Sequence, residues 1–133
     1  MGRTGADIVC IQETKAQEHQ LSAPEYCPQG YFCQYHDAEK KGYSGVAIYS
    51  RRRPSKVVTA MGVDEFDREG RYVEAQFPGV SVVSLYVPSG SSSEERQAAK
   101  FRFMEAFYPF LMRLRRRRRE YIICGDWNIA HKQ

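Results

Sequence analysis

The stretch VSVVSLYVPSGSSSEERQAAKFRFMEAFYPFLMRLRRRRREYIICGDWN, residues 80–128, decides the fold. It begins with an apolar run over 80–87 and ends with a second one over 121–124, and both are typical of buried strands. A long segment with helical spacing of its apolar residues separates them. One long helix before a final strand, with several strands upstream, predicts a mixed sheet covered by helices, of the α+β or α/β class.

The predicted helix has recognisable ends and one apolar face. Ser91 or Ser92, each followed by a glutamate three residues later, has the spacing of a capping box. We expect Pro109 to kink the helix. The arginine run 115–119 closes it, because cations suit the C-terminal end of the helix dipole. The stripe that faces the core consists of Phe103, Phe107, Phe110, Leu111 and Leu114.

The residues before this stretch predict further strands. Residues 7–12 form an apolar run that ends abruptly in polar residues, as a buried strand does. The alternation over 71–77 and the run 80–87 flank Pro78-Gly79, which predicts a hairpin. Short strands are also expected over 31–35, 46–49 and 57–58.

Length and composition fit a single globular domain. The chain has 133 residues, of which 42% are hydrophobic and 27% charged. It holds no apolar run long enough for a membrane span and no signal-peptide core at its start, so we expect a cytoplasmic protein. The net charge of +4 is a local feature, because without the five arginines of 115–119 the balance becomes −1.

The four cysteines are expected to be free thiols. Cys10 and Cys124 lie in apolar runs and are predicted to be buried. Cys27, Cys33 and His36 could form part of a metal site, but their spacing fits no common zinc pattern and a fourth ligand is missing.

Polar groups follow three of the predicted strands directly. Glu13 follows the first strand, Tyr86 and Ser89 end the strand over 80–87, and Asp126 and Asn128 follow the last one. Sheets of this class place their sites at such strand ends. Two carboxylates that converge there would provide oxygen ligands suited to Mg²⁺. The alternative for each residue is a surface loop or a cap.

Five ordered motifs resemble one known family, the exonuclease III type of apurinic/apyrimidinic endonuclease within the endonuclease/exonuclease/phosphatase superfamily. They span nearly the whole chain, and residues 88–96 resemble bacterial members in particular. The motifs are IQETK (11–15), KGYSGVA (41–47), EGRYV (69–73), SLYVPSG (84–90) and CGDWNIAH (124–131).

The resemblance implies a role for each matching residue of the reaction centre. Glu13 would be the metal-ligating carboxylate, and Lys15 would sit beside the site and help to hold neighbouring carboxylates. Tyr86 would lie at the scissile phosphate. Asp126 would position or deprotonate the attacking water, and Asn128 would orient Asp126 and the phosphate.

The same resemblance implies contacts with the DNA backbone. Gly42, Tyr43 and Arg71 would provide them. Ser89 stands where many members carry Asn or Gln, and it could still donate to a phosphate with a shorter reach.

The resemblance also implies a partial fold. Members begin with an earlier strand that carries a Ser-X-Asn motif, and they continue to a terminal Asp-His pair. We therefore expect one incomplete domain over 1–133, about the first half of a four-layer α/β/β/α sandwich without its first strand. Such a half is expected to hold one sheet with a bare apolar inner face.

The function implied is Mg²⁺-dependent hydrolysis of DNA phosphodiesters in base excision repair, with Mn²⁺ as a substitute metal. The substrates would be double-stranded DNA with abasic sites or 3′ ends, cut by a protein that is monomeric when complete and associated with the bacterial nucleoid. One alternative is a phosphatase acting on a phosphoinositide or lipid phosphoester. Another is a non-catalytic fragment that binds nucleic acid through residues 115–119, although four strand residues, roughly 13 Å, separate that run from Asp126.

Overall fold

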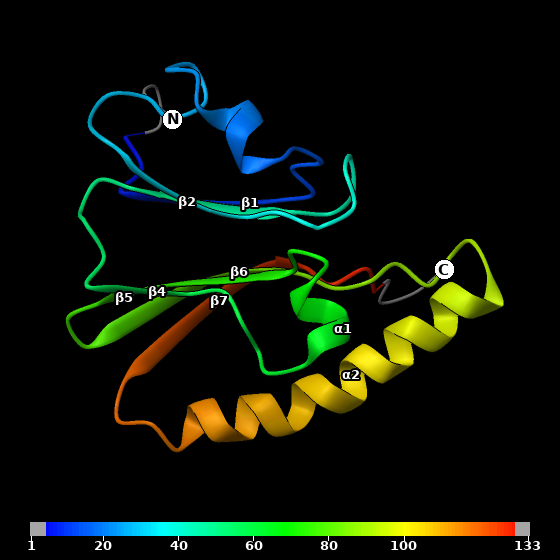
Figure 1. Ribbon diagram of the computed structural model, residues 1–133. Coiled ribbons are helices and arrows are strands. Elements are labelled where there is room, and N and C mark those ends of the chain that lie inside the picture. The colour runs from blue at the N-terminus through cyan, green and yellow to red at the C-terminus, as the bar shows by residue number, and fades with distance from the viewer. Residues whose placement is uncertain (1–4, 130–133) are drawn as a thin grey trace.

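The computed structural model describes residues 5–129 and shows two β-sheets packed face to face, with one long helix across the outer face of one of them (Figure 1). This mixed arrangement confirms the predicted fold class. The first and last residues of the chain, including Ala130 and His131 of the last motif, lie outside the described residues.

The first sheet has three antiparallel strands in the order β1-β3-β2. They are β1 (Ile8–Gln12), β2 (Phe32–His36) and β3 (Val46–Ser50), and the 3₁₀ helix η1 (Glu18–Leu21) lies in the connection from β1 to β2. The central strand β3 is buried over its whole length.

The second sheet has the order β4-β5-β6-β7. Its strands are β4 (Lys56–Val58), β5 (Tyr72–Phe77), β6 (Val80–Tyr86) and β7 (Glu120–Asp126). The predicted hairpin is confirmed, because β5 pairs antiparallel with β6 across Pro78-Gly79. Strand β7 pairs parallel with β6, which requires a crossover connection, and the helix α2 (Glu94–Arg115) provides it. A one-turn helix, α1 (Asp64–Asp67), precedes β5.

Two apolar cores hold these layers together. One lies between α2 and the second sheet and contains Phe103, Phe107, Phe110 and Leu114, as the helical stripe predicts. The other lies between the two sheets and consists of Val46, Ile48, Val73, Ala75, Phe77 and Val82. The expectation of one sheet with a bare inner face is therefore wrong, since residues 8–50 already form the second layer.

The helix and the cysteines depart from prediction in detail. Ser93, rather than Ser91 or Ser92, caps α2 by accepting a hydrogen bond from the Arg96 backbone amide. The helix runs unbroken through Pro109. Within residues 5–129, no helix is long and apolar enough to cross a membrane.

Two cysteine predictions are wrong. Cys27 and Cys33 form a disulfide, because the turn between them brings their Cα atoms to 6.0 Å, and this removes both sulfurs from any metal site. Cys124 is exposed, because it lies on β7 at the edge of the second sheet, while Cys10 is partly buried.

Candidate functional site

Three predicted site residues meet where strands of the two sheets end. Tyr86 ends β6 and is the register partner of Asp126, which ends β7. Glu13 follows β1 in the opposite sheet. Just before these ends, the Gln12 side-chain amide donates to Ser84 Oγ at 2.8 Å, and this hydroxyl donates to a β1 carbonyl. This polar link fixes the end of β1 against the end of β6.

A cavity of about 190 Å³ opens at this edge. Its lining includes seven of the nine predicted site residues, and Asp126 and Asn128 are the two that it does not include. The seven are Glu13, Lys15, Gly42, Tyr43, Arg71, Tyr86 and Ser89. Loops far apart in the sequence therefore build one polar hollow.

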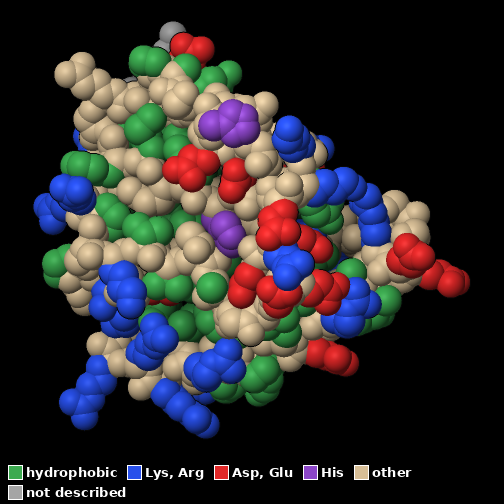
Figure 2. Space-filling model, in the orientation of Figure 1, with side chains coloured by type: hydrophobic (Ala, Val, Ile, Leu, Met, Phe, Trp, Pro, Cys, Tyr) green, Lys and Arg blue, Asp and Glu red, His purple; other side chains and the backbone are tan. Residues whose placement is uncertain are grey.

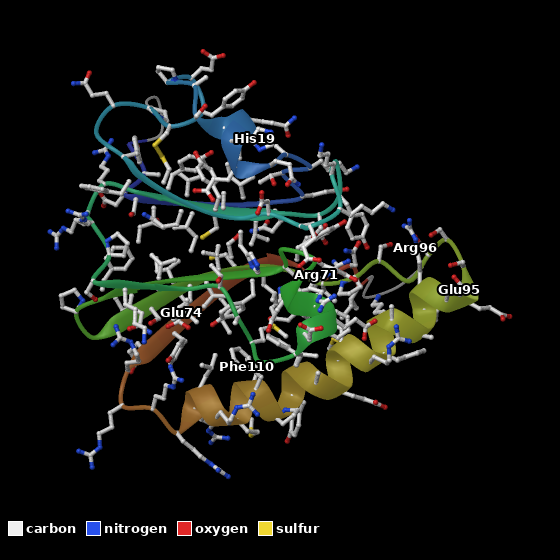
Figure 3. All side chains as sticks on the ribbon, viewed as in Figure 1. His19, Arg71, Glu74, Glu95, Arg96 and Phe110 are labelled. Atoms are coloured by element: carbon white, nitrogen blue, oxygen red, sulfur yellow. A yellow bond between two sulfur atoms is a disulfide. The ribbon has the colours of Figure 1, made fainter. Side chains whose placement is uncertain are left out.

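Arg71 is the buried centre of this hollow. Its side chain is only 4% exposed and pairs with Glu69. The same guanidinium donates to the Tyr43 hydroxyl at 2.9 Å and to the Tyr86 carbonyl at 3.2 Å, and it lies over both tyrosine rings. Figure 3 shows Arg71 at the end of the sheets toward the start of α2, where Arg96 lies. Since its donors are directed at protein groups, Arg71 holds the two tyrosines in place.

Backbone hydrogen bonds tie the loops around the cavity to one another. The Lys15 amide donates to the Ser44 carbonyl at 2.7 Å, and the Gly45 amide donates to the Gly70 carbonyl at 3.1 Å. Gly70 has a φ of +58°, and a Cβ there would lie 2.5 Å from backbone atoms of His36 and Asp37. Only glycine fits this close approach, which explains the glycine of the EGRYV motif.

The pKa of Tyr86 is affected by burial and by the charges near it. Burial raises the pKa of its phenol above the ordinary value, and the carboxylates of Glu13 and Asp126 raise this pKa further. The cations Arg71 and Lys15 act in the opposite direction. Tyr86 therefore keeps its proton at neutral pH and acts as a hydrogen-bond donor, and both carboxylates lie close enough to influence it.

Asp126 and Asn128 form a tight polar turn after β7. The Asn128 backbone amide donates to Asp126 Oδ1 at 3.0 Å, and the Asn128 side-chain amide donates to the Val87 carbonyl at 2.7 Å. Asn128 thus anchors the turn to the residue after β6 and fixes one carboxylate oxygen of Asp126. Within residues 5–129 no group donates a hydrogen bond to the other oxygen, and Asp126 is exposed.

Glu13 is the residue best suited to hold a metal ion. Its side chain is 43% exposed at the cavity and pairs with Lys15 at 3.0 Å. No cluster of three or more His, Cys, Asp or Glu groups that could hold a metal occurs within residues 5–129. Mg²⁺ needs no such cage, because one or two carboxylates with water and substrate phosphates suffice. The donors present therefore fit a Mg²⁺ ion held by Glu13 and completed by the substrate.

The sequence reasoning missed four residues of this site. Gln12 and Ser84 make the link between the sheets, and the signal for them was two polar residues inside apolar strand runs. Glu69 and Arg96 line the cavity, Glu69 as the partner of Arg71. Glu69 belongs to the EGRYV motif and Arg96 to the stretch 88–96, but nothing in their spacing indicated which way their side chains would point.

The comparisons with known proteins agree on one family. The sequence profile described as Endonuclease/Exonuclease/phosphatase family matches residues 1–132. The chain is 37% identical over 128 residues to an exodeoxyribonuclease of Bacillus subtilis, covering 96% of this chain and 49% of that protein. It is 38% identical over 132 residues to the DNA repair nuclease APEX1 of Danio rerio, covering 96% of this chain and 41% of the relative. The chain thus spans half or less of the length of these curated relatives.

A solved structure matches the fold as well. The AP endonuclease from Archaeoglobus fulgidus superimposes with a TM-score of 0.83 at 29% identity, covering 98% of this chain and 50% of that one. The 3′-5′ exonuclease NExo from Neisseria meningitidis gives a TM-score of 0.80 at 28% identity, covering 93% of this chain and 48% of the other.

Proposed function

The chain belongs to the endonuclease/exonuclease/phosphatase family, and from this premise we propose that it forms part of a DNA-repair nuclease that cuts phosphodiesters at abasic sites and at 3′ ends. The relatives are named as a DNA exonuclease and a DNA repair nuclease, which favours DNA over a phosphoinositide or lipid substrate. The observation that carries the proposal is the convergence of Glu13, Tyr86 and Asp126 from three strand ends on one edge of the fold.

We propose that Asp126 handles the attacking water. One of its oxygens accepts a hydrogen bond from the Asn128 amide, and the other oxygen can accept the proton of water. Asn128 acts through Asp126, whose orientation it fixes. Water deprotonated beside a phosphodiester becomes the nucleophile.

Tyr86 is proposed to stabilise the charge that builds up on the phosphate. Its protonated hydroxyl is a neutral donor near two carboxylates, and a buried guanidinium lies over its ring. A donor that is already oriented before reaction stabilises the developing charge without reorganisation. Arg71 is proposed to be a positioning residue that holds Tyr86 and Tyr43 in place.

Glu13 would hold a divalent metal, for which we propose Mg²⁺ with Mn²⁺ as a substitute. Such an ion would supply Lewis-acid stabilisation of the phosphoryl oxygens. Lys15, 3.0 Å from Glu13, orients this carboxylate before the metal and substrate bind.

The remaining cavity residues are proposed to bind the DNA backbone. The Gly42 backbone, the Tyr43 hydroxyl and the Ser89 hydroxyl can each reach a phosphate at the cavity. We add Arg96, an exposed cation on the cavity wall at the start of α2. The partner would be double-stranded DNA, bound by a monomer in the bacterial cytoplasm.

The test is incision of a duplex that carries one abasic-site analogue. We expect the chain fused to the remaining half of the Bacillus subtilis relative to cut with Mg²⁺ and not with chelator, and Asp126→Asn in this fusion to lose at least a hundredfold, the order of a general-base contribution. Glu105→Gln, which removes an exposed carboxylate from the outer part of α2, is the matched control and should cut normally. Absence of cutting by this chain, and also by the chain fused to the remaining half of the Bacillus subtilis relative, would refute the proposal.

A further inference from the structure

Arginines from two runs distant in sequence lie beside the turn between β5 and β6, at the end of β7 opposite to Asp126. We call this surface the basic end, and define it as Arg51, Arg52, Arg53, Arg113 and residues 115–119. Arg119 joins the end of α2 to the turn by donating to the Phe77 and Val80 carbonyls. Arg52 and Arg53 line a hollow on the other side of the same turn, together with Phe77 and Val80. Two arginine runs distant in sequence therefore form one surface.

Two acids lie at the basic end, Asp7 in the hollow with Arg52 and Arg53 and Glu120 beside Arg119, but in the described part of the chain neither forms a salt bridge with its arginines. Within residues 5–129, none of its arginines takes part in a salt bridge. Its few side-chain hydrogen bonds go to neutral groups, such as the Tyr31 and Tyr121 hydroxyls. Besides the arginines of the basic end, residues 5–129 hold nine lysines and arginines against sixteen acidic residues, so the excess of positive charge is local. Figure 2 shows basic side chains gathered at the lower left of the view and acidic ones toward the right.

The basic end also has a shape that can receive an anion. A surface hollow of about 620 Å³ lies between the end of α2 and the start of β7. Its lining includes Arg115, Arg117, Arg118 and Arg119. An arginine fork can contact a phosphate through two parallel hydrogen bonds. Several such forks in one hollow suit a chain of phosphates better than a single small anion.

The basic end is separate from the proposed catalytic site. Strand β7 begins at Glu120 beside the arginine run and ends at Asp126. Its seven residues span roughly 20 Å. A ligand on the basic end therefore leaves the cavity free.

We propose that the basic end is a second binding surface for double-stranded nucleic acid, which holds the phosphate backbone of a duplex away from the cutting site. A membrane surface is disfavoured, because basic segments that bind bilayers also present large apolar side chains for insertion. Exposed large apolar residues border the basic end at Val57, Tyr108 and Ile122, but none lies among its arginines, within 51–56 or 109–121. The inference goes beyond the proposed function, since it requires no cleavage.

The test is binding of a plain duplex without an abasic site, in the presence of chelator, by the 133-residue chain. The variant Arg115→Gln/Arg118→Gln removes two exposed arginines of the hollow. The control Arg68→Gln/Arg102→Gln removes two exposed arginines from the surface around Asp64 and Glu65. Equal net charge in the two variants separates a local contact from a general electrostatic effect, and thermal melts check that both are folded.

Each phosphate contact contributes about −0.9 to the slope of log affinity against log salt. We expect the slope of Arg115→Gln/Arg118→Gln to become shallower by about 1.8, with roughly ten- to sixtyfold weaker binding at 0.1 M salt. Arg52→Gln/Arg53→Gln, across the turn, should weaken binding in the same direction. The inference would be overturned if both basic-end variants kept the salt dependence of the parent. It would also be overturned if Arg68→Gln/Arg102→Gln lost as much affinity as they do. Binding of phosphatidylserine vesicles that depends on these arginines, while duplex binding does not, would have the same consequence.

Discussion

Gly70→Ala tests whether the close packing of the loops, rather than backbone conformation alone, builds the cavity. Gly70 has a φ of +58°, and its added Cβ would lie 2.5 Å from the His36 oxygen and the Asp37 carbonyl carbon and 2.7 Å from the Ala38 nitrogen. All three are backbone atoms, so no side chain can move aside. The left-handed conformation costs about 1–2 kcal/mol. Overpacking adds about 1–3 kcal/mol.

Gly79→Ala is the matched control. Gly79 has a φ of +76°, and a Cβ there meets nothing within 4 Å, so only the conformational cost of about 1–2 kcal/mol applies. Both substitutions reduce the conformational entropy of the unfolded chain by the same amount, so this contribution cancels when the two variants are compared. For a chain of this size, 1 kcal/mol shifts the melting temperature by about 4 °C.

We therefore expect Gly70→Ala to melt about 4–12 °C below Gly79→Ala, measured by circular dichroism, with the order confirmed by urea unfolding. The Gly70 carbonyl also accepts hydrogen bonds from the Gly45 amide and the Ser44 hydroxyl, at 3.1 and 3.3 Å. Incision should consequently fall in Gly70→Ala and persist in Gly79→Ala. Equal melting temperatures for the two variants would show that the contact with residues 36–38 does not constrain the loop.

Three further predictions concern the site and its surroundings. Tyr86→Phe should reduce incision without altering the pH profile below about pH 10, because the raised pKa keeps the tyrosine protonated throughout that range. A loss of parental activity near pH 8 that is absent from the variant would contradict this. Lys15→Met should tighten Mn²⁺ binding at Glu13 by roughly two- to fivefold, the size of an exposed ion pair, as measured by electron paramagnetic resonance, and an unchanged Kd would argue against Glu13 as the ligand. Cys27→Ser/Cys33→Ser should lower the free energy of unfolding in urea by about 2 kcal/mol, because the short loop is no longer closed. Reductant should lower the free energy of unfolding of the parent by the same amount and leave that of the variant unchanged.

The parts of the fold that follow local rules could be predicted from the sequence. The hairpin around Pro78-Gly79 and the helix before β7 carry strong periodic patterns, and both are present. The pairing of β1 with β3 carries no such signal, because it joins residues about 40 positions apart. For this reason the prediction missed that a second sheet is present within residues 8–50.

The burial of charged side chains was the other feature that sequence patterns did not predict. Arg71 was predicted as a DNA contact, but its guanidinium is enclosed by Glu69, Tyr43 and Tyr86. Glu74 belongs to the alternating segment 71–77; it is 1% exposed and accepts hydrogen bonds from the Tyr72 hydroxyl at 2.7 Å and the Ser81 hydroxyl at 2.9 Å. A motif fixes which residue stands at a position, whereas the direction of its side chain depends on layers that fold from distant segments.

Backbone strain marks the same site as the motifs do. In residues 5–129, the residues other than glycine with positive φ are Glu13, Lys15, Ser44 and Asn128, at +49° to +58°. Each costs on the order of 1–2 kcal/mol, so their clustering at one edge needs compensation. The compensation is visible in the Lys15 amide bond to the Ser44 carbonyl, and in the Asn128 side-chain bond to the Val87 carbonyl.

These bonds hold the strained residues in one conformation before any ligand arrives. The two sheets have separate strands and separate registers, so without cross-links the end of β1 could shift relative to the ends of β6 and β7. The strained turns and the Gln12–Ser84 hydrogen bond prevent this shift. A site that depends on carboxylates from both sheets at a fixed separation requires that rigidity, because electrostatic stabilisation is lost when donors must reorganise during the reaction. The strain is thus the cost of holding Glu13 and Asp126 in fixed positions near Tyr86.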